Sequence, residues 1–517
     1  MLIAAVDIGT SSTRALLFDD AQFTGTAVAV EYALHCPAPG AAELDPAAVL
    51  RALIKCLSDL SLASAETIDC VSLSSAMHSL IAVDATGAAL TPAYTWADNR
   101  ASRQAAALRS SAGAQALYAE TGVPIHPMSP LVKLLWLKET LPAVFDQAAK
   151  FVSIKEYACY HLFERWIVDD SIASASGFYS LAARDWSATA LAVAGIGRAR
   201  LSPVARTETV LRGLLPAPAT AMHLDRGMPF VLGASDGCLA NLGAGLLAGE
   251  SRRRAVLTIG TSGALRMAVE RPAPDAAMRT FCYALGYEQF VIGGATNGGG
   301  LPMRWLRDNF PQLRVDVAQT DGVAPAASVD PYAALASIAE QAPPGAGGLL
   351  FHPYLAGERA PLWNSDARAS FVGLNFGHGP AHMVRAVMEG VLFNLAMILE
   401  VLEELAGGPV DEIIAGGGFA HSPFWLQMAA DLFGRPLLVA ENPETTAQGA
   451  ALLAIRTLGD AGSLHHVVAL MQQPGRRVLP NPQTHALYSR LRPIFAAIPA
   501  KLAPAYAELT AFQRDCG

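Results

Sequence analysis

The chain has 517 residues with a formal net charge of −8, and 16% of its residues are charged. This length favours two or more domains, and the acidic balance argues against nucleic-acid binding, which usually needs a basic surface. No run of about 20 apolar residues lacks charges or breakers, and no basic segment opens the chain, so neither a membrane span nor a secretory signal is expected.

The seven cysteines are scattered and form no C-x-x-C pair. This spacing favours reduced, buried thiols over disulfides or a zinc site. We therefore expect a cytoplasmic protein without nucleic-acid or membrane partners. The oligomeric state is not encoded in these patterns, and a homodimer stays open. The cysteines are Cys36, Cys56, Cys70, Cys159, Cys238, Cys282 and Cys516.

In chain order, the first half predicts three strands, one helix and two further strands. They span residues 2–6, 15–18, 26–32, 45–61, 71–73 and 79–83. Asp45 is a suitable N-cap for the helix, with Pro46 at its first position. Three strands, a helix and a strand in this order are typical of a ribonuclease-H-like unit.

Between the halves, residues 228–232 predict a strand. The second half then repeats the order of the first, with strands expected within 255–269 and 290–292, a long amphipathic helix over 380–405 and a further apolar run at 413–414. The segment 243–254 contains glycines and three consecutive arginines and is a candidate hinge. We therefore predict an N-terminal domain over 1–248 and a C-terminal domain over 249–517.

A glycine- and hydroxyl-rich turn occurs once in each half. Gly9, Thr10, Ser11 and Ser12 follow one apolar run, and Gly260, Thr261 and Ser262 follow the other. An apolar run on each side of a tight turn indicates a β-hairpin. Such a turn offers N–H and O–H donors to a phosphate, and Arg14 follows the first turn. No G-x-x-x-x-G-K-[ST] motif is present, so a P-loop is not expected. The duplication predicts two hairpins that bind one polyphosphate.

Two carboxylates stand at strand ends. Asp7 precedes the first turn and could hold Mg²⁺ directly or through water; its alternative role is to cap the turn. Thr258 takes the equivalent place in the second copy. Asp236 lies among small residues and could accept a proton from a substrate hydroxyl. Its alternative role is an ordinary turn-forming aspartate beside glycine.

Other short segments fit either a ligand site or the core. His78, after Met77, could donate to a polyol or be a satisfied core histidine. The segment Trp96 to Arg100, which includes Asp98, suits a sugar or forms a structural salt bridge. The glycines of 297–300 and 416–418 allow close approach by a nucleotide, or simply form tight turns.

Three longer segments together resemble the FGGY carbohydrate kinases. They are Met128 to Leu137, Ala369 to Leu374 and His382 to Gly390, and the likeness covers nearly the whole chain. The resemblance implies an α/β, actin-like ATPase fold made of two ribonuclease-H-like domains with an interdomain cleft. It also implies transfer of the γ-phosphate of ATP, with Mg²⁺, to a sugar or polyol hydroxyl.

The same resemblance assigns roles to individual residues. Asp236 matches the catalytic base, and Asp7 matches the magnesium-linked acid. Arg304 stands where glycerol kinases carry Gln. Residues on the sugar side are Met77, His78, Trp96, Asp98, Met128 and Asp236; those on the nucleotide side are Gly9, Thr10, Ser11, Ser12, Arg14, Gly260, Thr261, Ser262, Gly300, Arg304, Gly417, Gly418 and Ser422.

The resemblance to this family also narrows the choice of substrate. Met77-His78 replaces the Arg-Glu pair of glycerol kinases, and the strings at 74–81, 95–100, 126–131 and 153–157 look most like the family's gluconokinases. The resemblance thus implies phosphorylation of D-gluconate to 6-phosphogluconate, with xylulose or another polyol as the alternative. A non-catalytic actin-like sensor or scaffold is the rival of another class. Lys133, Lys155 and Arg100 are candidate partners of a substrate carboxylate.

Overall fold

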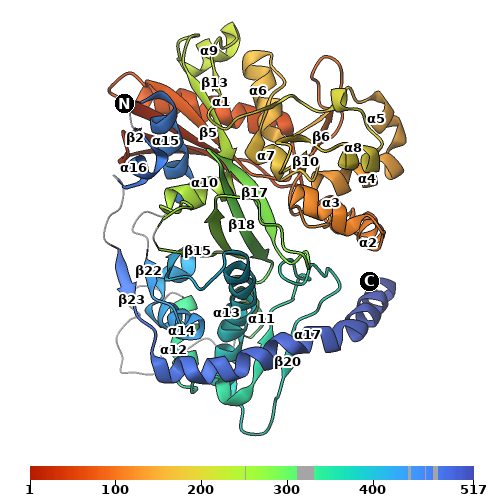
Figure 1. Cartoon of the computed structure of the whole chain (residues 1–517), viewed down its shortest axis with the longest axis vertical. Helices are drawn as coiled ribbons and strands as arrows, with labels where there is room; N and C mark the ends of the chain where they lie inside the picture. Colours follow the sequence, from red (N-terminus) through yellow and green to blue (C-terminus); the bar gives the residue numbers. More distant parts are fainter. Residues whose placement is uncertain (251, 311–330, 440–443, 460–461, 470–474, 517) are drawn as a thin grey trace, which may run out of the picture. The chain divides into compact units, whose positions relative to one another are not determined.

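The computed structural model describes residues 1–517 except 251, 311–330, 440–443, 460–461, 470–474 and 517 (Figure 1). The chain forms two compact units. The first contains Met1–Glu250, Ala268–Ile292 and Glu444–Gln473; the second contains Ser251–Met267, Gly293–Pro443 and Pro474–Gly517. Each unit is therefore built from three separate segments, which the sequence did not predict. The domain boundary at 248/249 stays a prediction.

A six-stranded sheet forms the centre of the first unit, in the order β13-β14-β5-β1-β2-β3. β1 and β2 are antiparallel, as are β2 and β3, whereas β5 runs parallel to β1 and to β14. The predicted hairpin and the predicted strand at 71–73 are confirmed, and the structure adds that this strand pairs with β1 in parallel. The strands are β1 (Leu2–Ile8), β2 (Ser12–Asp19), β3 (Gln22–Glu31), β5 (Cys70–Ser75), β13 (Val210–Leu211) and β14 (Phe230–Ser235).

Helices cover both faces of this sheet, and alternate residues of β1 point to different helices. Ala4 and Val6 belong to a core cluster with Leu53 of α1 (Pro46–Ala63). Ile3 and Ala5 belong to another core cluster, with residues of α15 (Thr445–Leu458). Burial on both sides explains why β1 is apolar at nearly every position rather than at every second one.

The start of α1 is confirmed. The Asp45 side chain accepts a hydrogen bond from the Ala47 amide at 3.0 Å, and Pro46 is the first helical residue. The helix continues two residues beyond the predicted end, to Ala63.

The second sheet has the order β17-β18-β16-β15-β21-β22-β23. β15 and β16 form the second predicted hairpin, and β21 runs parallel to β15 as β5 does to β1. This repeated arrangement confirms the duplication, although β17 was not predicted. The strands are β15 (Arg254–Ile259), β16 (Gly263–Val269), β17 (Phe281–Gly286), β18 (Gln289–Thr296), β21 (Glu412–Gly416), β22 (Leu437–Val439) and β23 (Arg476–Val478).

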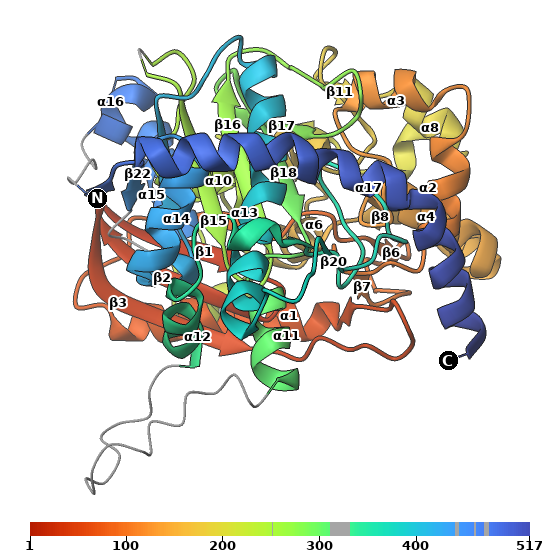
Figure 2. The same ribbon diagram turned by 90° about the horizontal axis from the view of Figure 1, so that it is seen from below.

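The predicted bounds of α13 (Pro380–Leu405) are confirmed, but the charged side of this amphipathic helix is not exposed to solvent in its first half. Every residue from 384 to 396 is buried, including Arg385 and Glu389. The helix is enclosed because α12, α14 and α17 (Pro482–Cys516) all pack against it. Figure 2 shows α17 passing across α13. Arg385 and Glu389 pair with each other at 2.7 Å, so the buried charges are compensated.

The remaining elements are short. In the first unit they are β4 (Glu43–Leu44), β6 (Ile81–Val83), β7 (Ala93–Tyr94), α2 (Ser102–Arg109), α3 (Ala114–Thr121), α4 (Pro130–Thr140), α5 (Pro142–Gln147), β8 (Lys150–Val152), α6 (Ile154–Phe163), β9 (Val168–Asp169), α7 (Asp170–Ser174), β10 (Tyr179–Ser180), β11 (Asp185–Trp186), α8 (Ala188–Ala194), β12 (Val204–Ala205), α9 (Pro216–Met222), α10 (Asp236–Gly243) and α16 (Leu464–Ala469). In the second unit they are α11 (Leu301–Asn309), α12 (Pro331–Glu340), β19 (Leu350–His352), β20 (Ser370–Val372) and α14 (Pro423–Phe433).

The cysteine prediction needs one correction. Five of the six cysteines whose side chains are described are buried and free, but Cys36 is exposed. Cys36 lies in the loop between β3 and β4. The Cys516 side chain lies outside the described residues. In the described part of the chain, no helix has the length and apolar character needed to cross a membrane.

Candidate active site

The first glycine turn joins β1 to β2. The Gly9 amide donates to the Ser12 carbonyl at 3.0 Å, and a Cβ at Gly9 would lie 2.9 Å from that oxygen, so a side chain would crowd the turn. The indole of Trp96 donates to the Thr10 hydroxyl at 3.1 Å. Ser11 is exposed, and Thr10 is half-buried. The structure therefore brings the predicted phosphate turn and the predicted sugar-side Trp96 into direct contact.

Asp7 lies buried between two donors. Its carboxylate receives Arg14 Nη2 at 3.1 Å and the Ser74 hydroxyl at 3.2 Å. Arg14 also donates to both carboxylate oxygens of Glu444, at 3.1 and 2.9 Å. Glu444 is a site residue that the sequence analysis missed, because 430 positions separate it from Arg14 and no local pattern joins them. Arg14 is thus fixed beside the first turn by two acids.

The second glycine turn is packed against two other glycine segments. The Gly260 amide donates to the Ser262 carbonyl at 2.9 Å, and the Gly300 amide donates to the Gly260 carbonyl at 2.6 Å. A Cβ on Gly417, whose φ is +87°, would lie 2.6 Å from the Ile259 carbonyl oxygen. Close backbone packing therefore explains glycine at 300 and 417, whereas a Cβ at Gly260 would meet no atom within 4 Å. The second unit brings these predicted nucleotide-side residues together.

A buried acid fixes the segment before Gly300. Glu358 accepts the Asn297 amide at 2.6 Å and Asn394 Nδ2 at 2.9 Å. Arg359 Nε donates to the Asn297 side-chain oxygen at 2.8 Å. Burial raises the pKa of Glu358 to about 7. The hydrogen bonds from the backbone amide of Asn297 and the side chain of Asn394 oppose that rise. The site residues Glu358 and Arg359 were missed because neither lies in a recognisable glycine motif.

The remaining nucleotide-side predictions sit differently. Arg304 is exposed on α11. The Ser422 hydroxyl accepts the Trp425 amide at 3.3 Å and so caps α14. Gly418 is exposed and begins a short 3₁₀ turn that ends at His421. Ser422 therefore has a local structural role, and contact of these three residues with a nucleotide stays a prediction.

Asp236 is the first residue of α10, directly after β14. Its carboxylate accepts the Gly237 amide at 2.7 Å, and the residue is half-buried. Gly233 allows the strand to reach this point, because it adopts a φ of +70° and a Cβ there would lie 1.7 Å from the Leu73 carbonyl oxygen. A helix N-terminus favours a negatively charged side chain. The Asp236 carboxylate thus lies at the start of α10, where β14 ends.

His78 is buried in a left-handed conformation with a φ of +69°. Its Nδ1 lies 2.8 Å from the Ala175 carbonyl, and its Nε2 lies 3.4 Å from the Tyr283 hydroxyl. A neutral ring that donates from Nδ1 can only accept at Nε2. The expected donation to a polyol would therefore need the imidazolium form. Met77, next to it, is half-buried.

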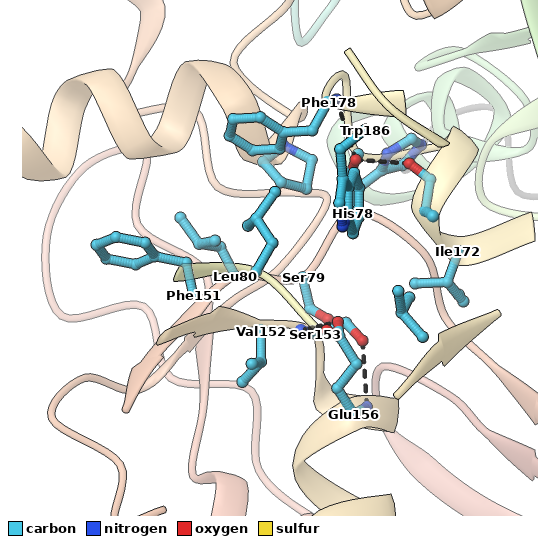
Figure 3. A pocket seen from close by; sticks show the side chains of 15 residues that line it. His78, Ser79, Leu80, Phe151, Val152, Ser153, Glu156, Ile172, Phe178 and Trp186 are labelled. Carbon is cyan, nitrogen blue, oxygen red and sulfur yellow. Dashed lines mark hydrogen bonds between the residues drawn. The ribbon is translucent and has the colours of Figure 1, made fainter. Parts of the chain in front are cut away.

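Behind His78 lies a small pocket of about 30 Å³, shown in Figure 3. Its polar lining includes Ser79, Ser153 and Glu156. This volume holds about two water molecules, which is too little for a six-carbon sugar acid. The pocket therefore does not form the substrate site by itself.

The remaining sugar-side predictions are largely internal. Asp98 is 2% exposed, and its carboxylate accepts Arg100 Nη2 at 2.6 Å and the Ala42 amide at 3.1 Å. The buried Lys133 ammonium donates to the carbonyl of Met128, which is itself buried. Burial lowers the pKa of Lys133 to about 7. This geometry favours the structural alternative for Asp98, and direct substrate contact by Asp98 or Met128 stays a prediction.

Comparison with known proteins agrees with this architecture. Residues 2–243 match the N-terminal domain, and residues 255–458 the C-terminal domain, of the FGGY family of carbohydrate kinases. Gluconokinases from Bacillus subtilis and Bacillus licheniformis are 39% and 40% identical, over 98% and 99% of this chain and 98% of their own length. A xylulose kinase from Bacillus subtilis is 27% identical over 96% of each chain.

Solved structures give the same class. A gluconate kinase and a xylulose kinase from Lactobacillus acidophilus each superpose with a TM-score of 0.90, at 32% identity, over 98% of this chain and 99% of theirs. The protein belongs to the FGGY family of carbohydrate kinases, and it is an enzyme that transfers phosphate to an alcohol. The predicted family and two-domain fold class are confirmed.

Proposed function

We propose that the protein is an ATP-dependent gluconokinase that phosphorylates the terminal hydroxyl of D-gluconate. One observation carries the proposal: identity to gluconokinases is 39–40% along nearly the full chain, against 27% for the xylulose kinase. The residues described above are compatible with this chemistry.

Asp236 is the proposed general base. As the hydroxyl oxygen forms its bond to the γ-phosphorus, the bond from that phosphorus to the β,γ-bridging oxygen breaks and ADP leaves. The hydroxyl proton passes to the Asp236 carboxylate. The position of Asp236 supports this role, because a helix start favours the charged carboxylate and the half-buried side chain stays reachable.

The two glycine turns are the proposed phosphate contacts. Their amides and hydroxyls supply donors to phosphate oxygens without a lysine. Arg14 adds a cation, although Asp7 and Glu444 already share its charge. Mg²⁺ prefers oxygen ligands such as a carboxylate close to phosphates, and it commonly keeps several waters. Asp7 would hold the ion, which when bound offsets charge on the transferred phosphoryl group.

Direct capture of the gluconate carboxylate by the three suggested cations receives no support from the structure. Lys155 pairs with Asp169 at 2.7 Å, Arg100 is held by Asp98, and Lys133 donates to a backbone carbonyl. Each of these three cations therefore already has a partner inside the first unit.

Xylulose is the second candidate substrate, because the Lactobacillus acidophilus gluconate and xylulose kinase structures match this chain equally well. An ADP-coupled assay with gluconate, xylulose, glycerol and ribulose distinguishes the two. We expect kcat/KM for gluconate to exceed that for xylulose at least tenfold, since a site built for a carboxylate discriminates strongly against substrates that lack one. A higher value for xylulose would overturn the assignment.

We also propose a cytoplasmic location. Six cysteines are free in the described residues, and one of them is exposed, which suits a reducing compartment.

A further inference from the structure

A completely buried ion pair lies beneath the proposed base. Lys155 near the start of α6 is 1% exposed, Asp169 at the end of β9 is 0% exposed, and their charged groups are 2.7 Å apart. Lys155 Nζ also lies 3.4 Å from the carbonyl of Ala234. Ala234 is on β14, two residues before Asp236. The pair therefore touches the strand that carries the base.

The short helix α7 continues this connection. Asp169 caps it by accepting the Ile172 amide at 2.8 Å. Ser171 is the second residue of α7. Its hydroxyl lies 3.0 Å from the Ser235 hydroxyl and accepts a hydrogen bond from the Ser235 amide at 3.2 Å. Ser235 directly precedes Asp236. The contacts of Lys155 and Ser171 thus hold the last two residues of β14 before Asp236.

The other end of α7 reaches the second sugar-side residue. The carbonyl of Ala175, the residue that follows the helix, is the partner of His78 Nδ1 at 2.8 Å. One five-residue helix therefore lies in contact with both Asp236's strand and His78. A shift of α7 would move both groups together.

We propose that Lys155, Asp169 and Ser171 are positioning residues for Asp236; we name these three the α7 bracket. The inference rests on the proposed function, in which Asp236 is the base. The bracket acts on the base through the backbone of β14 rather than through substrate or nucleotide. It sets the direction in which the carboxylate points, because it binds the backbone at Ala234 and Ser235. Phosphoryl transfer is sensitive to such placement, since a misplacement of about 1 Å can cost about a hundredfold in rate.

Fold stability alone does not explain this arrangement. A buried ion pair stabilises a fold weakly, because desolvation offsets the attraction, and an apolar pair of similar volume often serves as well. The Lys155–Asp169 pair instead offers directed hydrogen bonds to one carbonyl and one helix start.

Ser171→Ala is the first test. Ser174→Ala is its matched control, because Ser174 lies on the same helix, is equally buried, and contacts the Ala284 amide at 2.9 Å rather than β14. We expect Ser171→Ala to lower kcat about tenfold with KM for ATP unchanged, and Ser174→Ala to leave kcat within about twofold. Both should shift the thermal unfolding midpoint to a similar extent.

The second test replaces both members of the Lys155–Asp169 ion pair with uncharged side chains. Lys155→Met alone would leave a buried, uncompensated Asp169 and endanger folding. The double variant Lys155→Met/Asp169→Asn avoids this, since Asn can still accept the Ile172 amide and cap α7. We expect its kcat to fall about ten- to a hundredfold at unchanged KM for ATP.

Wild type and Asp236→Asn are measured in the same assay. If wild type phosphorylates no member of the panel, or if Asp236→Asn stays active, the proposed function fails and the bracket loses its premise. If those two behave as expected but Ser171→Ala and the double variant keep wild-type kcat, only the bracket is overturned. Equal kcat losses in Ser171→Ala and Ser174→Ala would also overturn it, because they would show a general packing effect.

Discussion

Asp236 is the residue on which the proposed chemistry depends most directly. Asp236→Asn keeps the size of the side chain and can still accept the Gly237 amide, but an amide cannot take up the substrate proton. We expect kcat to fall by about a hundred- to ten-thousandfold, with KM for ATP changed little, because general-base catalysis contributes about that much. Single-turnover phosphate transfer measures this loss. A kcat within tenfold of wild type would refute the role.

Asp7 carries the proposed link to the metal ion. Asp7→Asn keeps an acceptor for the Ser74 hydroxyl but loses the negative charge beside Arg14. We expect the Mg²⁺ concentration for half-maximal activity to rise severalfold, since carboxylate is a preferred ligand of this ion. The matched control is Asp59→Asn, which breaks the exposed Lys55–Asp59 ion pair and should leave the Mg²⁺ dependence unchanged. An unaltered Mg²⁺ titration in Asp7→Asn would contradict the assignment.

Among the elements, those with local signals were predicted well. Asp45 and Pro46 mark the start of α1, and the Gly-Thr-Ser turns mark both hairpins. The enclosure of α13 was not predictable, because it depends on α17, which begins 77 residues after α13 ends. Local periodicity reports which residues are apolar, not how many neighbours surround a helix.

The turn at Gly417 makes an element-level prediction. Gly417→Ala would place a Cβ 2.6 Å from the Ile259 carbonyl oxygen in a backbone conformation that alanine rarely adopts. We expect the segment to shift and KM for ATP to rise about tenfold, with KM for gluconate nearly unchanged. Gly379→Ala is the control, since no atom lies within 4 Å of a Cβ there. If only KM for gluconate rose, the assignment of this turn to ATP binding would be wrong.

Over the whole molecule, the duplication and many residues of the candidate site could be predicted from the sequence. The long-range contacts that hold those residues in place could not. Motifs found Asp7, Asp236 and His78 because each stands beside a turn. They could not find Glu444 or Tyr283, which reach Arg14 and His78 from segments 430 and 205 positions away. Such pairs arise only when the chain re-enters the first unit, and no local pattern encodes that return.

Buried acids also determine how the stability of this low-charge chain should respond to pH. Burial raises the pKa of Glu156 in the first unit to about 7, from an ordinary value of 4.5. Below pH 4.5 the group is protonated in folded and unfolded chains alike. Between about 4.5 and 7 the folded state binds more protons, so the free energy of unfolding falls as pH rises, and the full loss is present above 7.

Glu156→Gln isolates this effect. Glutamine preserves the capping box with Ser153, whose amide now donates to Glu156 at 2.6 Å, but it does not titrate. We expect the variant to unfold at nearly the wild-type temperature at pH 5 and several degrees higher at pH 8. The pKa shift corresponds to at most about 3 kcal/mol. Calorimetric scans at four pH values measure the gap, with the exposed Glu66→Gln as control. A gap that stays constant from pH 5 to 8 would show that Glu156 does not titrate in this range, since only a proton-linked difference grows with pH.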